Sequence, residues 1–189
     1  MSEKSGITRR QALGGLGLMG AGALLSSCFP GGAIAQTPNV DVDVLNFALN
    51  LEYLEAEFYL AAVGRTPTYG TGAGMAASGG AAVTGGTTVN WNNDLGGALS
   101  PAFRQAVQAY ATEIAIDEEN HVKFLRSALG AAAVARPAID IGPAFAAAAN
   151  AALGTTLSPA FNPYDNALYF LHGAFIFEDV GVTAYKGAA

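Results

Sequence analysis

The stretch NLEYLEAEFY, residues 50–59, decides the fold. It belongs to a run from Asp41 to Val63 that contains no Gly or Pro, which predicts one long helix. At about 100° per residue, one narrow stripe of this helix carries polar side chains, namely Glu52, Glu55 and Tyr59. Glu57 falls on the opposite face, and most of the remaining surface is apolar. Because such a helix is expected to be buried, its carboxylates need ion pairs or a bound cation.

A second long helix is predicted from Pro101 to Leu129, because Ser100 is a favourable N-cap, proline suits the first helical position and Gly130 ends the run. Within it, Glu118 and His121 are three residues apart and lie one turn apart on the same face. A carboxylate and an imidazole placed in this way can bind a transition metal together. Glu and His are also common on solvated helix surfaces, so this pair alone does not establish a site.

A third long helix is predicted from Asn162-Pro163 towards Lys186. Glu178 stands in the apolar segment FIFEDV, and Tyr185 follows seven residues later on the same face. Glu52 and Tyr59 have the same spacing, so the first and third helices are predicted to be pseudo-twofold partners that each offer a Glu to a shared centre. The two tyrosines are interpreted either as hydrogen-bond donors to these carboxylates or as core residues.

The connections between these helices have their own patterns. Residues 66–97 are rich in Gly, Thr and Ala, and we expect a loop in which Val83–Trp91 forms a short β-hairpin around Gly85-Gly86. Residues 131–158 form a crossover with a short helix from Pro143 to Leu153.

Taken in order, residues 50–59, 117–126 and 178–185 resemble the first three helices of ferritin-like proteins. Within the ferritin-like proteins, these segments most resemble the exported branch that includes the desiccation-related proteins. The resemblance covers residues 41–189 and implies an all-α, ferritin-like helical bundle.

The resemblance also implies a metal centre with two iron or two manganese ions. Glu52 and Glu178 would be the ligands contributed singly, and Glu118 and His121 would form the Glu-x-x-His pair. Glu55 would be an auxiliary ligand.

The sequence departs from the family pattern after the third helix. The family has a fourth helix with a second Glu-x-x-His, and nothing follows Ala189. His172 lies about 120° around the helix from Glu178 and is a poor substitute, so it is interpreted as a core or surface residue. The chain is therefore expected to be incomplete at its C-terminus, either as a shortened sequence or as a natural remnant. We expect three long helices and about one weakly bound metal ion or none. Three helices would leave an apolar seam, which predicts a partner helix or a homo-oligomer.

Residues 1–35 are interpreted as an export signal. Arg9-Arg10 precede a Gly-rich apolar run at residues 12–25, which resembles a twin-arginine signal more than the start of a core helix. Two processing sites remain open: a lipobox that would attach a lipid anchor to Cys28, and a small-residue site at 33–35. The protein is thus expected in the periplasm or at the cell surface.

The charge balance limits the partners. The formal net charge is −6 and the chain has nine basic residues, which argues against nucleic acid and is compatible with cations. Two functions remain open: metal handling or oxidative and desiccation stress at a metal site, and a non-catalytic stress-protective protein with a degraded site.

Overall fold

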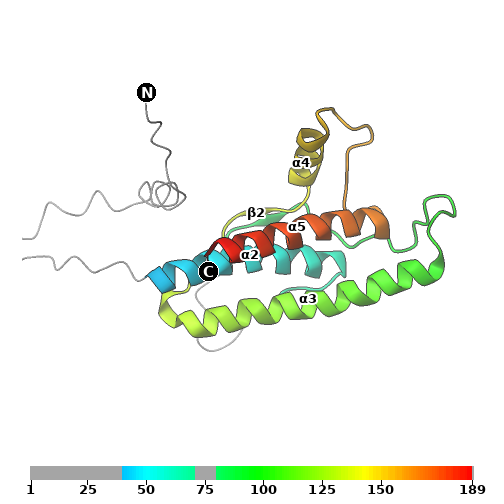
Figure 1. The fold of residues 1–189 in the computed structure, drawn as a ribbon. Coiled ribbons are helices and arrows are strands. Elements are labelled where there is room, and N and C mark those ends of the chain that lie inside the picture. The colour runs from blue at the N-terminus through cyan, green and yellow to red at the C-terminus, as the bar shows by residue number, and fades with distance from the viewer. Residues whose placement is uncertain (1–39, 71–79, 189) are drawn as a thin grey trace, which may run out of the picture. The chain divides into compact units, whose positions relative to one another are not determined.

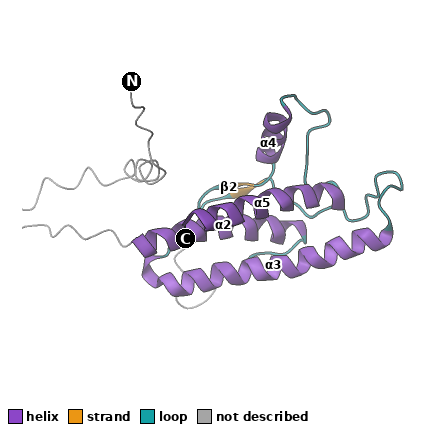
Figure 2. Cartoon of the chain, in the orientation of Figure 1, coloured by secondary structure: helices purple, strands orange, loops and turns teal. Residues whose placement is uncertain are grey.

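Helices make up most of the residues that the structure describes. The computed structural model describes residues 40–70 and 80–188. Three long helices dominate these ranges: α2 (Val40–Ala62), α3 (Pro101–Leu129) and α5 (Ala167–Ala188). The connections contain a shorter helix, α4 (Pro143–Leu153), a 3-10 turn, η1 (Gly130–Ala132), and two strands, β1 (Val83–Thr84) and β2 (Ile139–Asp140) (Figure 2). The predicted all-α class is therefore confirmed. The predicted export signal at 1–35, with Cys28, lies outside the described residues.

The directions of the long helices follow from the length of their connections. α2 and α3 run antiparallel, and α5 runs in the same direction as α3 (Figure 1). This is possible because residues 130–166 return the chain to the end at which α3 begins. In the described ranges, no helix combines the length and the apolar character that a membrane crossing requires.

Local capping explains the helix ends. The Ser100 hydroxyl accepts a hydrogen bond from the backbone N–H of Phe103 at 3.2 Å, so α3 begins where it was predicted to begin. The predicted bounds of α3 and α4 are both confirmed. The predicted start of the third helix at Asn162-Pro163 is wrong, because Asn162 caps a turn by accepting from the N–H of Tyr164. Asn166 instead accepts from the N–H of Tyr169 at 3.0 Å, and α5 begins after it.

The predicted hairpin at residues 83–91 is also wrong. β1 pairs with β2 in parallel, with Val83 opposite Ile139 and Thr84 opposite Asp140. Gly85 has a φ of +81°, and a Cβ atom there would lie 2.5 Å from the Cα of Gly142. The glycine therefore lets the chain pass against the distant crossover instead of turning back on itself.

α2 is the most buried helix, as its apolar sequence predicts. From Glu52 to Leu60 its side chains are buried except for Leu54, which is partly exposed. Phe58 stacks on Phe170 with ring centroids 5.5 Å apart and meets the edge of Phe177 at 4.9 Å. These aromatic contacts hold α5 against α2. The carboxylates of α2 are thereby withdrawn from water.

A row of polar side chains on α2 forms hydrogen bonds and an ion pair with the segment that follows α3. The Asn46 amide bonds the backbone of residues 132–134 twice, at 2.9 Å each, and the Tyr53 hydroxyl donates to the same segment at 3.1 Å. Two residues further on, Arg136 forms an ion pair with the buried Glu57. We refer to Asn46, Tyr53 and Glu57 as the anchoring row of α2.

Candidate metal centre

Three side chains from α2 and α3 converge between these helices. The Nδ1 atom of His121 lies 3.2 Å from Oε2 of Glu52 and 3.1 Å from Oε2 of Glu118. One ligand atom from each of the three residues lies within 4.8 Å of the others. Both carboxylates are buried, whereas the His121 side chain is 55% exposed. Helical spacing places Glu118 beside His121, three positions away. The packing of α2 on α3 brings Glu52, which is 69 positions away in the sequence, to the same point.

Glu55 adds a third buried carboxylate beside this group. Burial raises its pKa from 4.5 to about 8, and the charges of Glu118, Glu52 and Glu178 add to the effect. The backbone of α5 approaches it closely, because a Cβ atom on Gly181 would lie 2.8 Å from its Oε1. Glu55 therefore lies where α2 meets α5, within electrostatic reach of the other carboxylates.

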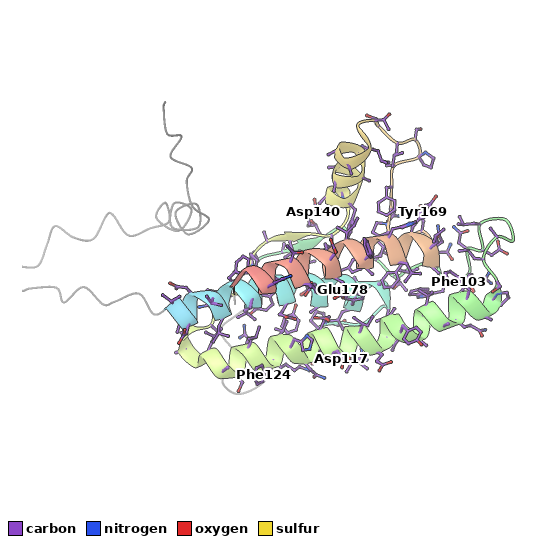
Figure 3. The ribbon with its side chains drawn as sticks, in the orientation of Figure 1. Phe103, Asp117, Phe124, Asp140, Tyr169 and Glu178 are labelled. Carbon is purple, nitrogen blue, oxygen red and sulfur yellow. The ribbon has the colours of Figure 1, made fainter. Side chains whose placement is uncertain are left out.

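Glu178, which Figure 3 labels, lies on α5 and contacts Tyr59 of α2. The Tyr59 hydroxyl donates a hydrogen bond to Oε1 of Glu178 at 2.7 Å. Burial raises the pKa of Tyr59, and this hydrogen bond raises it further, so the phenol keeps its proton. Glu178 itself is exposed and is not among the three residues within 4.8 Å of one another. The side chain of Tyr185 lies outside what the structure describes, and His172 is exposed on α5.

The electrostatics of the group favour a cation. Burial, and then the neighbouring Glu52 carboxyl, raise the pKa of Glu118. Partial burial lowers the pKa of His121, but the carboxylates of Glu118 and Glu52 outweigh this and raise it overall. Repulsion among buried carboxylates is thus relieved by protons in the metal-free protein.

This donor set fits a transition metal ion. A metal ion can replace the protons that the carboxylates would otherwise hold, and mixed carboxylate and imidazole ligands suit iron, manganese and zinc. A cavity of about 220 Å³ opens beside Glu52 and His121, with Phe124 and Leu125 as its other walls. Small solutes can therefore reach the group from solvent.

Exposed apolar side chains flank the centre on both sides. On α3, Tyr110 and Phe124 are 66% and 70% exposed, at helical spacings from His121. On α5, Phe175 and Val182 are 69% and 68% exposed, on the side that carries Glu178. Exposed apolar side chains thus occur on both helices, while the apolar seam and what covers it stay predictions.

A second polar cluster on the back of α2 was not foreseen from the sequence. Glu57, which the helical wheel places opposite the stripe of Glu52, is buried and bonded to both Arg136 and Tyr69. Its partners are 79 and 12 residues away, so no local spacing signals the contact. The one signal in the sequence is that Glu57 stands on a helix expected to be buried, where an unpaired carboxylate is costly and a cation is therefore needed nearby.

The fold and this group of side chains define the class of helical bundles that direct carboxylate and histidine side chains inward. The sequence model of the ferritin-like domain family matches residues 40–189, and the chain belongs to that family. This confirms the resemblance drawn from the three helices.

Two relatives support the assignment. The chain is 33% identical over 156 residues to desiccation-related protein PCC13-62 of Craterostigma plantagineum, covering 80% of this chain and 44% of that protein. It is 31% identical over 149 residues to ferritin-like catalase Nec2 of Nesocodon mauritianus, covering 78% of this chain and 43% of that protein. The chain thus spans less than half the length of either relative. No solved structure matches it significantly.

Proposed function

We propose that this chain is an exported ferritin-like protein that binds one iron or manganese ion through Glu52, Glu118 and His121. Its role would be in metal handling or in protection against oxidative or desiccation stress. The observation that carries the proposal is the convergence of two buried carboxylates on one imidazole, at 3.1 and 3.2 Å. The names of the two relatives support the stress and peroxide-related part of the proposal.

The surrounding residues have distinct roles in this proposal. A bound iron or manganese ion would supply one-electron redox chemistry towards peroxide or dioxygen. Tyr59 holds the Glu178 carboxylate in one orientation by donating to its Oε1. Glu55, with its pKa near 8, keeps a proton beside the ligands at neutral pH and can exchange it as the charge of the site changes. Three of the four ligands expected from the sequence lie together, which suffices for one ion with water as a further ligand and is few for two.

Export and assembly complete the proposal. The paired arginines at positions 9 and 10 would direct the protein out of the cytoplasm, and Cys28 would carry a lipid if the lipobox is processed. The exposed apolar side chains of α3 and α5 would be covered by a partner helix or by a second copy of the chain.

A second candidate function is that of a non-catalytic, stress-protective helical protein with a degraded site. The observation that favours it is exposure: the His121 side chain is 55% exposed and Glu178 lies at the surface. Water competes with exposed ligands, so metal affinity would then be too low to matter. Metal binding therefore separates the two candidates.

Metal analysis of the full chain tests the proposal. After anaerobic loading with Fe(II) or Mn(II) and removal of free ions, we expect about one ion per chain, and none in Glu118→Ala or His121→Ala. Glu113→Ala is the matched control, since Glu113 is exposed on the same helix. Glu57 is unsuitable as a control because it is buried in an ion pair. An unloaded wild type would favour the stress-protective candidate, and binding that survives Glu118→Ala would place the site elsewhere.

A further inference from the structure

A second cavity, of about 220 Å³, lies beneath α4 and shares no lining residue with the cavity beside His121. Five parts of the chain form its walls, and nearly all of the lining residues are apolar. Leu54 comes from α2, Phe145 and Ala148 from α4, Phe161 from the loop that follows, and Phe177 from α5. Asp140, which Figure 3 labels at the foot of α4, is the one charged residue in the lining.

The composition of α4 agrees with a role as a wall of this cavity. Its eleven residues, Pro143–Leu153, include no charged side chain, and only Phe145 is buried. Packing against the long helices therefore does not account for its apolar character. The cavity is open to solvent on one side, since Ala148 and Asp140 are exposed. A ligand of the right size would withdraw its apolar walls from water and add dispersion contacts to them.

The size and polarity of the cavity define the class of ligand. An apolar cavity of roughly 150 Å³ accepts benzene in another protein, so 220 Å³ suits one aromatic ring with a small substituent. Phe145, Phe161 and Phe177 offer ring faces and edges for such a molecule. The Asp140 carboxylate is held in place at Oδ1, which accepts from the N–H of Gly142 at 2.9 Å. Its charge and the net charge of −6 disfavour fatty acids and other anions.

We propose that the cavity beneath α4 binds a small, neutral aromatic molecule that donates one hydrogen bond to Asp140. Indole and phenols belong to this class. The site is independent of the metal centre, so the proposal stands or falls separately from the function proposed above.

Binding of indole to the full chain, with and without metal, tests the proposal. By titration calorimetry or saturation-transfer NMR we expect a Kd on the order of 0.1–1 mM, as is usual for a ligand of this size. Ala148→Leu should weaken binding at least tenfold because leucine fills the cavity. Ala147→Leu is the matched control, since Ala147 is exposed on the same helix and does not line the cavity, and it should change the Kd less than twofold.

Two further measurements guard against misleading results. Circular dichroism of both variants checks that α4 and the long helices are retained. Asp140→Asn keeps the oxygen that caps Gly142 and removes the charge, so it should weaken indole several-fold and leave toluene, which has no donor, unchanged.

The proposal is overturned if the wild type shows no saturable binding at millimolar indole, or if Ala147→Leu and Ala148→Leu weaken binding equally. It is also overturned if the chain self-associates, indole does not bind, and Ala148→Leu alone dissociates the assembly. A second copy of the chain would then be the occupant. Sedimentation velocity of the wild type and both variants distinguishes this outcome.

Discussion

Replacing Glu55 with Gln should stabilise the metal-free protein at alkaline pH. Glu55 is buried among carboxylates, and its pKa is raised from 4.5 to about 8. The folded state therefore binds this proton more tightly than the unfolded chain does. The contribution to stability is fully present below pH 4.5 and is lost as the pH rises through about 8.

The size of the effect follows from linkage. One pKa unit corresponds to about 1.4 kcal/mol, so the whole shift sets an upper limit of about 5 kcal/mol. Solvent enters the cavity beside Glu52 and His121 and screens the carboxylate charges. We therefore expect Glu55 to change the free energy of unfolding by about 2 kcal/mol between pH 5 and pH 9. Gln has the shape of the protonated acid and no charge to desolvate, so the variant should lack this part of the pH dependence.

Urea unfolding of the metal-free chain, followed by circular dichroism from pH 5 to pH 9, measures the difference. Glu113→Gln, at an exposed position of α3, should keep the pH dependence of the wild type. Addition of Mn(II) should flatten the wild-type curve, because the metal replaces the protons. If Glu55→Gln and the wild type lose stability in parallel as the pH rises, the carboxylates do not repel one another as described, and the electrostatic account of the site is wrong.

Three other changes test separate parts of the structure. Arg136→Ala leaves a buried carboxylate without its cation and should lower the free energy of unfolding by about 3 kcal/mol in urea titrations, whereas Arg136→Lys should recover part of the loss. Gly181→Ala places a methyl group against Glu55 and should weaken metal binding, measured by metal analysis, with little change in helicity by circular dichroism. Replacing Arg9 and Arg10 together with Lys should retain the protein in the cytoplasm in cell fractionation, and unchanged export would contradict the twin-arginine interpretation.

The sequence predicted those features that depend on neighbouring residues. Ser100 and Pro101 specify where α3 begins, and Gly130 ends it, because caps act within one turn. Helical periodicity also placed Glu52 and Glu55 on one stripe of α2, and Glu118 and His121 on one face of α3. These features require no knowledge of how the chain folds back on itself.

Features that depend on distant partners were not predictable in the same way. β1 pairs with a strand about 55 residues away, and nothing in residues 83–91 indicates that partner. The local Gly85-Gly86 pair therefore predicted a hairpin instead. Asn162 and Asn166 are both good caps, and only the packing of the preceding turn decides which of them begins α5. The ion pair of Glu57 depends on where the crossover runs.

The two rows of polar side chains along α2 constrain how this helix can change in evolution. The anchoring row, Asn46, Tyr53 and Glu57, faces the segment after α3, while Glu52 and Glu55 face the candidate metal centre. One inserted or deleted residue between positions 53 and 55 would rotate one part of the helix by about 100° relative to the other and split both rows. Both rows would then lose their partners at once, since a single rigid helix carries them. Substitutions can accumulate along α2, but changes in its length should be rejected, and length variation among relatives should instead fall in the loops at either end.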